Sequence, residues 1–244
     1  MTDGIQEEFA ERCAELLDET KTALRNRDSW DNYLGLGAGE QVIAGDHEER
    51  HLLELLQNAR DAIYRGRMEQ SALPGRVFVA VTDHGMAMAN TGSPFRLDDE
   101  RVLKAVRLLQ RSEKAGQGFI GHKGVGLKSI LLRAGGFSVR SRIDGQTLRA
   151  TFSRSRTAAH LLKYLNENSD SVAEGQLRYF QQQLPRLPLF TQPHADAAGQ
   201  SSLGPDTSVV TALLEDAGAR QLGLDSLGQP TSLLPYTTVV YLPY

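Results

Sequence analysis

The chain has 244 residues, of which 40% are hydrophobic and 23% charged, and its formal net charge is −3. This length and composition are ordinary for a soluble globular protein with a sizeable core, organised as one large domain or two small ones. The sequence pI of about 6.1 excludes a general basic field. Nucleic acid is therefore not indicated as a partner, although a local basic groove stays open.

The cysteine content and the N-terminus bear on the compartment. Cys13 is the single cysteine, so it has no partner for an internal disulfide, and the spacing of Cys and His residues gives no zinc site. The N-terminus is acidic where a signal peptide would be basic and then apolar. No apolar run reaches the length of a membrane span. We therefore expect a cytoplasmic protein that does not contact a membrane.

The N-terminal quarter predicts two helices separated by a loop. Residues 4–27 place apolar side chains roughly on one face of a helix. The stretch LGLGAGEQVIAGDHEER (34–50) is rich in glycine and is expected to form a loop. A second amphipathic helix is expected from about Glu48 to Arg65, where Gly66 would end it.

The remaining elements alternate between strands and helices. In chain order the pattern first predicts a hairpin over 76–90 that turns at His84-Gly85, a helix over 96–114, a glycine-rich loop over 115–126 and a short helix over 127–134. A second hairpin is predicted over 137–153, with its turn at Asp144-Gly145. Helical segments at 158–168 and 176–184, a mobile loop over 194–206 and a strand over 237–243 follow.

This order of elements indicates an α+β fold rather than a doubly wound βαβ fold. We expect a two-layer sandwich in which a mostly antiparallel mixed sheet is covered on one face by helices. We further expect residues 1–45 to form an N-terminal helix and glycine-rich lead-in, and residues 46–244 to form the main domain.

Two short motifs carry the chemistry. In HLLELLQNARDAI, the side chains of Glu54, Asn58 and Asp61 are spaced by four and three residues, so they share one stripe of a helix. In GHKGVGLKSIL (121–131), three glycines allow close approach of the backbone, and the helix that follows offers free N–H groups to an anion. The second motif therefore predicts a phosphate-binding loop.

Together the two motifs resemble those of the GHKL ATPase superfamily, which includes gyrase B subunits, the large ATP-dependent heat-shock chaperones, histidine kinases and MutL. ELLQNARDA is similar to the superfamily's N box, E-L-x-x-N-A-x-D-A, and GHKGVGLKS to its second glycine box. With NTGSPF between them, the chain looks most like the sacsin-like bacterial ATP-binding domains. The resemblance covers residues 48–135 and implies the Bergerat-type ATP-binding fold.

The adenine contact and the closing threonine involve a choice between candidates. Asp83-His84-Gly85 offers a D-x-G motif, but it falls at the predicted hairpin turn. We therefore assign the adenine contact to Asn90, at the end of the second strand, where the superfamily usually has Asp. Thr238 is the expected threonine of the site, with Thr207 as the alternative.

The resemblance implies a site for ATP and Mg²⁺. The side-chain oxygen of Asn58 is the expected Mg²⁺ ligand, and Glu54, one turn earlier, is expected to orient or deprotonate the attacking water. Asp61 is implied to support the site from the same helix, and residues 110–119 to form a lid. Further nucleotide contacts are expected from Ala62, Asn90, Gly92, Phe95, Lys114, Gly121, Lys123, Gly124, Val125, Gly126, Lys128, Ser129 and Thr238.

Three functions remain open at this stage. The first is slow, Mg²⁺-dependent ATP hydrolysis that drives dimerisation or domain movement in a larger chaperone-like or defence-type machine. The second is an ATP sensor without appreciable turnover, and the third is histidine-kinase-like phosphotransfer. Kinases of the superfamily generally lack the carboxylate at the position of Glu54, so hydrolysis is favoured. A downstream domain or partner protein and an ATP-dependent homodimer are the expected protein partners.

Overall fold

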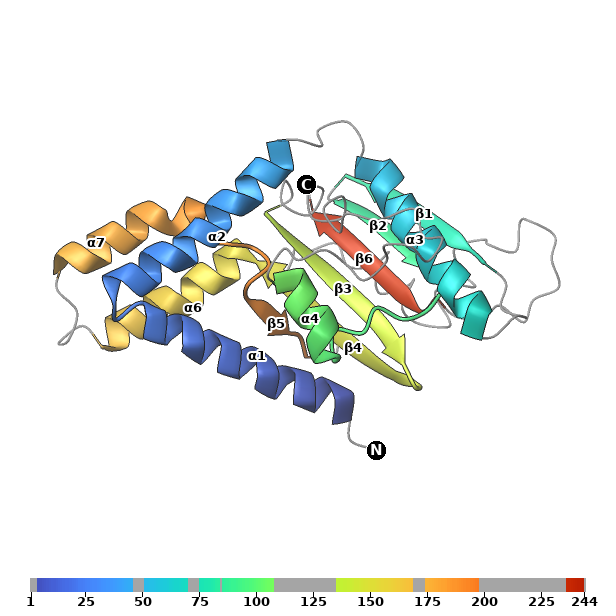
Figure 1. Ribbon diagram of the computed structural model, residues 1–244, viewed down its shortest axis with the longest axis horizontal. Helices are drawn as coiled ribbons and strands as arrows, with labels where there is room; N and C mark the ends of the chain where they lie inside the picture. Colours follow the sequence, from blue (N-terminus) through green and yellow to red (C-terminus); the bar gives the residue numbers. More distant parts are fainter. Residues whose placement is uncertain are drawn as a thin grey trace.

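A computed structural model describes residues 4–45, 51–69, 75–83, 85–107, 135–168, 174–197 and 236–243 (Figure 1). The helices are α1 (Gly4–Ala23), α2 (Arg27–Gly45), α3 (His51–Glu69), α4 (Glu100–Arg107), α6 (Arg154–Glu167), α7 (Glu174–Gln183) and the short 3₁₀ helix η2 (Leu184–Arg186). The strands are β1 (Val77–Thr82), β2 (Gly85–Asn90), β3 (Gly136–Ile143), β4 (Gln146–Ser153), β5 (Pro193–Ala195) and β6 (Thr238–Pro243).

The strands form one six-stranded sheet in the order β1-β2-β6-β3-β4-β5. The two predicted hairpins, β1–β2 and β3–β4, are confirmed. Asp144 and Gly145 both have positive φ, 49° and 80°, as a tight two-residue turn between right-twisted strands requires. Every neighbouring pair in the described sheet is antiparallel, so the expected mixed sheet is wrong for these residues, while the α+β class is confirmed.

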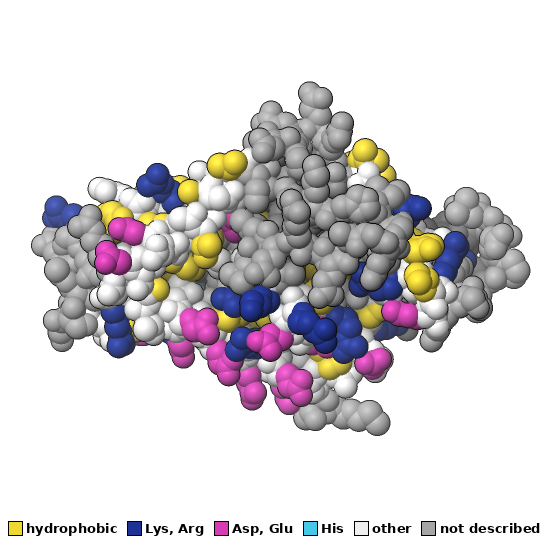
Figure 2. Space-filling view, viewed as in Figure 1, with side chains coloured by type: hydrophobic (Ala, Val, Ile, Leu, Met, Phe, Trp, Pro, Cys, Tyr) yellow, Lys and Arg dark blue, Asp and Glu magenta, His cyan; other side chains and the backbone are white. Residues whose placement is uncertain are grey.

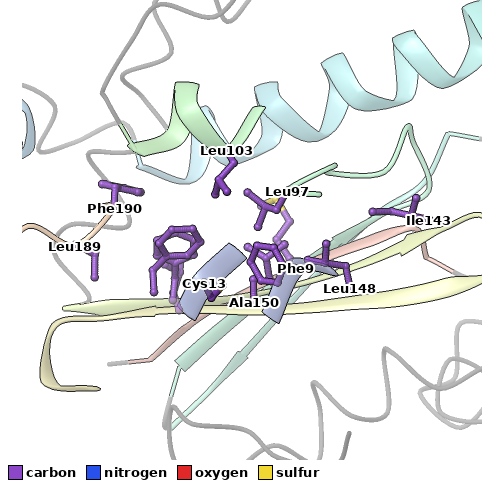
Figure 3. Packing of buried hydrophobic residues seen from close by; sticks show 14 of the residues in the cluster. Phe9, Cys13, Leu97, Leu103, Ile143, Leu148, Ala150, Leu189 and Phe190 are labelled. Carbon is purple, nitrogen blue, oxygen red and sulfur yellow. The ribbon is translucent and has the colours of Figure 1, made fainter. Parts of the chain in front are cut away.

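Helices α1, α3 and α4 lie on one face of the sheet, and the main core is between the two layers (Figure 1, Figure 3). Alternate strand residues point into this core, because successive side chains of a strand face opposite sides. The core includes Phe9, Cys13 and Leu16 of α1, Leu55 and Ala59 of α3, Leu103 of α4, and Phe137, Val139, Leu148, Ala150 and Phe152 of β3 and β4. Helix α1 thus packs in the same core as the sheet.

A second hydrophobic cluster joins α2, α6, α7 and the end of α1, beside the sheet. The glycine-rich stretch that predicted a loop from residue 34 is helical as far as Gly45, so that prediction is wrong. Trp30 and Leu34 are buried one turn apart in this helix. Gly37 sits so close to the carbonyl of Arg186 that a Cβ would collide with it. The glycine here serves close helix packing instead of a loop.

Three smaller expectations also differ from the structure. Helix α3 continues through Gly66 to Glu69, because Gly66 packs against the backbone of Ser93 and Gly92 instead of ending the helix. Gly85 pairs with Thr82 inside the hairpin, so it belongs to β2 and not to the turn. Among the described residues of the expected 194–206 loop, His194 lies in β5 and Asp196 is buried.

The predicted helix over 96–114 is described only to Arg107. Within the described ranges, no helix combines the length and the apolarity that crossing a bilayer requires.

Candidate functional site

Helix α3 places the polar stripe of the N-box-like motif beside its own buried face. Leu55 and Ala59 are buried in the main core, which fixes the rotation of the helix on the sheet. Asn58 is half-buried, and Asp61 is only 2% exposed, with its Oδ1 3.5 Å from Nη1 of Arg60. Glu54 lies on the same helix, four positions before Asn58, but its side chain is outside the described residues.

The turn that follows β2 is docked on this helix. The backbone N–H of Ser93 donates to the carbonyl of Ala62 at 2.9 Å. Gly92 approaches Ala62 and Ile63 so closely that a Cβ at position 92 would overlap their backbone atoms. Only glycine fits this contact, which explains physically why glycine stands at the second position after the strand.

Asn90 holds the same turn from inside the sheet. Its side chain is 8% exposed, and its Oδ1 accepts a hydrogen bond of 3.0 Å from the N–H of Gly92. A carbonyl oxygen has two acceptor sites, so this bond leaves Oδ1 able to accept a second donor. The geometry gives Asn90 a structural role in shaping the turn, and its ligand role stays a prediction.

The first residues of β6 complete the same row of polar groups. Thr238 lies directly opposite Asn90 on one side and Ser141 on the other, so the three residues form a row across β2, β6 and β3. Each of the three residues is two positions away, in its own strand, from a residue that lies in the main core or packs against it, so all three face the side of the sheet that the helices cover. Thr237 fastens the turn by donating from its backbone N–H to the carbonyl of Asn90, at 2.9 Å.

The hydroxyls of this row also anchor the segment after the turn. The backbone N–H of Phe95 donates to Ser141 Oγ at 2.8 Å and to Thr238 Oγ1 at 3.1 Å. The Thr237 hydroxyl donates to the carbonyls of Asn90 and Gly92, at 3.0 and 2.5 Å. Residues 90–95 are therefore tied to α3 on one side and to β6 and β3 on the other.

Ser141 and Thr237 belong to this arrangement, although the sequence did not single them out. Ser141 stands in a strand whose register against β6 is set by residues far away in the chain, so its pairing with Thr238 has no local signal. Thr237 did carry a signal, because it adjoins Thr238 in the predicted last strand.

The structure thus brings together α3, the turn after β2 and the start of β6. Several predicted site residues lie outside the described residues, and their placement stays a prediction: Lys114, Gly121, Lys123, Gly124, Val125, Gly126, Lys128, Ser129 and the alternative threonine, Thr207. In the part of the chain that is described, no three His, Cys, Asp or Glu side chains cluster as metal ligands. The predicted Mg²⁺ would take Asn58 as its single protein ligand beside phosphate and water oxygens, and it stays a prediction.

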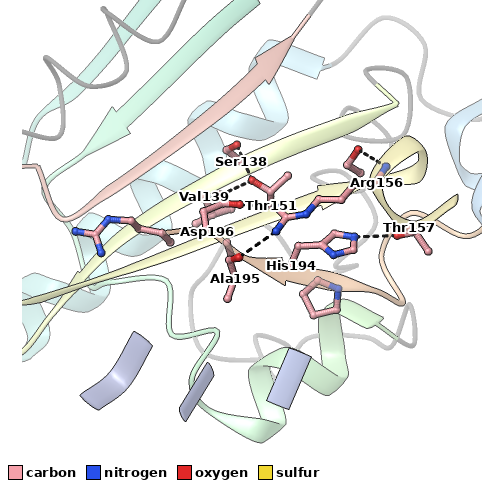
Figure 4. A network of polar contacts seen from close by, with 12 residues as sticks. Ser138, Val139, Thr151, Arg156, Thr157, His194, Ala195 and Asp196 are labelled. Atoms are coloured by element: carbon pink, nitrogen blue, oxygen red, sulfur yellow. Dashed lines mark hydrogen bonds and ion pairs between the residues drawn. The ribbon is translucent and has the colours of Figure 1, made fainter. Parts of the chain in front are cut away.

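A second polar cluster lies on the opposite face of the sheet and has a different character (Figure 4). The Asp196 carboxylate accepts from Thr151 Oγ1 at 2.6 Å, from Arg140 Nη1 at 3.0 Å and from Arg156 Nη1 at 2.6 Å. Burial lowers the pKa of Arg140, against the opposing effect of Asp196. Because these groups bond one another, the cluster serves to hold the segment that contains β5 against β4.

Comparison of the chain with protein-family models, curated proteins and solved structures finds no match. The candidate site therefore rests on the motifs and on the geometry described above. What the geometry defines directly is an α+β sheet protein whose buried polar row, Asn90, Thr238 and Ser141, lies on the face of the sheet that the helices cover, with Asn58 and Asp61 on α3 in the same layer.

Proposed function

We propose that this chain is a GHKL-type ATP-binding domain with a Bergerat-type fold that binds ATP with Mg²⁺ and hydrolyses it slowly. One observation carries the proposal. Three segments that were selected from sequence motifs alone, α3, residues 90–95 and the start of β6, contact one another through Gly92, Ser93 and Thr237. This contact supports the proposal because a nucleotide site of this type requires the three segments to lie side by side.

The helix supplies the phosphate end of the proposed site. The side-chain oxygen of Asn58 is a hard ligand of the kind Mg²⁺ takes, with phosphate oxygens and waters at the remaining positions. The ion, when bound, would neutralise charge on the phosphate oxygens. Glu54 would orient or deprotonate the attacking water, and the buried carboxylate of Asp61 would support the site from the next turn.

The polar row of the sheet supplies the base end. Asn90 Oδ1 would accept from the adenine amino group through the acceptor site that Gly92 does not use. An amide adds no charge assistance, so we expect weaker adenine binding than a carboxylate at this position would give. The Thr238 hydroxyl would contact the base or a bridging water beside it.

The phosphate-binding loop and the lid are proposed from the sequence alone. Gly121, Gly124 and Gly126 would bring backbone N–H groups to the phosphates, and Lys123 and Lys128 would add positive charge. Closure of the lid over nucleotide would drive dimerisation or domain movement in a larger chaperone-like or defence-type machine.

Isothermal titration of the full chain with a non-hydrolysable ATP analogue and Mg²⁺ tests the binding step. We expect Asn58→Ala to abolish the Mg²⁺-dependent binding, while Gln57→Ala, which removes a neighbouring half-buried amide of the same helix, leaves it within about twofold. No binding by the wild-type chain, or equal losses in both variants, would overturn the proposal.

Phosphate release tests the hydrolysis step separately. We expect slow release by the wild type and a loss of about a hundredfold or more in Glu54→Gln with binding retained. Binding without release from the wild type would favour the ATP-sensor function. Transfer of the γ-phosphate to an acid-labile site on protein would instead favour the histidine-kinase-like function.

A further inference from the structure

Among the described strands, β1 lies at one edge of the sheet. In the described part of the chain it pairs with β2 alone, and the six pairs from Val77–Asn90 to Thr82–Gly85 run without a bulge. The strand itself, VFVAVT, carries no charge and no proline. Soluble proteins usually protect an exposed edge with charged residues, proline or a bulge, so an unprotected edge of this length is a pairing surface.

The free backbone groups of β1 can be assigned to particular residues. The carbonyl of Arg76 accepts from the N–H of Thr91 at 3.2 Å, which continues the register of the two strands by one pair. Hydrogen-bonded and non-hydrogen-bonded pairs alternate along antiparallel strands. Val77, Val79 and Val81 therefore turn their N–H and C=O groups away from β2, towards the open edge.

The surface beside this edge is also apolar. In the described residues, the large hydrophobic side chains that are strongly exposed lie mostly on α3 and β1: Leu52, Leu53, Leu56, Tyr64, Met68, Val77 and Val81. Val81 is 66% exposed and Leu53 51%. Figure 2 shows hydrophobic side chains on the surface at the end of the molecule where Figure 1 places α3.

Helix α3 and β1 form one continuous surface. A Cβ on Gly75, two residues before β1, would contact Ile63 and Arg67, so this side of the helix lies over the start of the strand. Leu52 and Leu56 precede Ile63 by eleven and seven positions, spacings that place them on the same side of a helix as Ile63. The exposed leucines therefore flank the open edge, on the side of α3 away from Asn58.

We infer that β1 is the contact between two copies of this chain, paired antiparallel about a two-fold axis at Val79. Val77 of one copy then lies opposite Val81 of the other. All three valines whose backbone N–H and C=O groups point to the edge then form hydrogen-bonded pairs with the other copy. The pairing also brings Arg76 of each copy to the end of the strand where the other copy carries Asp83. A parallel pairing would place like charges together at both ends.

The α3 helices fit the same two-fold arrangement. Helix α3 lies over β1 and β2, and strands are spaced by about 4.8 Å, so the two helices would lie about 10 Å apart across the axis. This equals the usual distance between packed helices, so the exposed leucines would pack against their copies. The contact between the two copies is separate from the proposed nucleotide site and needs no nucleotide. This inference therefore does not rest on the proposed function.

Pairing through the sheet edge closes at two copies. The opposite edge of the described sheet, β5, has three residues, begins with Pro193 and is contacted by α1. It offers no comparable ladder, so among the described strands β1 is the usable edge, and an isologous pairing occupies it in both copies.

Light scattering coupled to size exclusion, on the full chain without nucleotide, tests the pairing. We expect a dimer mass that Val81→Lys converts to a monomer mass, with the dissociation constant raised about tenfold or more because each dimer carries two lysines on the edge. Val42→Lys is the matched control, since Val42 is 67% exposed on α2, and it should stay dimeric. A monomeric wild type would overturn the inference and would leave the edge of β1 to a strand from another protein. Equal effects of the two lysines would also overturn it.

Cysteine cross-linking tests the register. The double variant Val77→Cys with Val81→Cys should form a disulfide-linked dimer under mild oxidation, because the two positions are about 13 Å apart within one strand and cannot bridge inside a copy. The native Cys13 thiol is buried, and burial raises its pKa to about 12, so it should not compete. Cross-linking of Val81→Cys alone at the same yield would contradict an axis at Val79.

Discussion

Asn90 and Thr238 lie directly opposite each other in adjacent strands, although most of the chain separates them in sequence. Their side chains face the helix layer and hold the same segment, residues 90–95, through Gly92 and Phe95. The two residues that we propose for adenine binding therefore also build this turn. Stability and nucleotide binding should therefore both be measured on variants of these two residues, because one substitution can change both.

We predict that Ser141 and Thr238 share the task of accepting from the Phe95 N–H. Either Ser141→Ala or Thr238→Val leaves one acceptor, so each should cost less than about 1 kcal/mol of unfolding free energy, whereas the double variant leaves the N–H without either and should cost about 2 kcal/mol or more. Urea unfolding of the four proteins measures the coupling. Strictly additive losses would show that the two hydroxyls act independently.

A second prediction concerns the contact between Gly92 and α3. Gly92→Ala should destabilise the chain by about 1–3 kcal/mol, because the added Cβ overlaps the backbone of Ala62 and Ile63. Gly35→Ala in α2 is the matched control, since nothing lies within 4 Å of its Cβ, and it should stabilise the chain by about 0.5–1 kcal/mol. Thermal unfolding of both variants decides the matter, and the same sign for the two would contradict the close approach at Gly92.

The sequence predicted the local elements of the fold well where turn chemistry and periodicity agreed. The Asp144-Gly145 turn and the alternating β-formers on either side define the β3–β4 hairpin without tertiary information. The glycines of α2 misled the prediction because glycine marks both loops and close helix packing. What distinguished the two was the carbonyl of Arg186 beside Gly37, which is remote in sequence.

The candidate site shows the same division. Asn58 and Asp61 could be placed on one stripe because helical spacing is local, and Asn90 and Gly92 because they follow a strand with a clear pattern. Ser141 could not be found, since its role depends on the register between β3 and β6. Register is set by the whole sheet, and a single strand's sequence does not encode its partner.

Glu40 offers a third prediction, about the joint between α2 and the sheet layer. Its carboxylate is 1% exposed and accepts from the N–H groups of Leu189 and Phe190, at 2.7 and 2.9 Å. Glu40→Ala leaves both buried donors without this acceptor and should cost about 3 kcal/mol or more, while Glu40→Gln keeps one acceptor oxygen and should cost less. The neighbouring exposed Gln41→Ala should stay within about 0.5 kcal/mol in chemical denaturation. If Glu40→Ala lost no more unfolding free energy than Gln41→Ala, the Glu40 carboxylate would not be what holds α2 to Leu189 and Phe190.

The last prediction is a dependence of stability on pH that originates in the buried His194. Burial, together with the nearby charge of Arg156, lowers the pKa of His194 to about 3, and its Nε2 lies 2.9 Å from Thr157 Oγ1. In the unfolded chain the imidazole takes up a proton near pH 6.5, so between that pH and about 3 the unfolded state binds one proton more than the folded state. The unfolding free energy should therefore fall as the pH is lowered through this window, by up to about 1.4 kcal/mol per pH unit from this residue. His194→Gln should remove the contribution of this residue to the pH dependence of the unfolding free energy. The same change at the more exposed His160, whose ring stacks on His194, should remove less of it.

Urea unfolding from pH 7 to pH 5 measures this pH dependence. If the unfolding free energy of the wild type and of His194→Gln changed equally with pH, His194 would already be protonated in the folded chain.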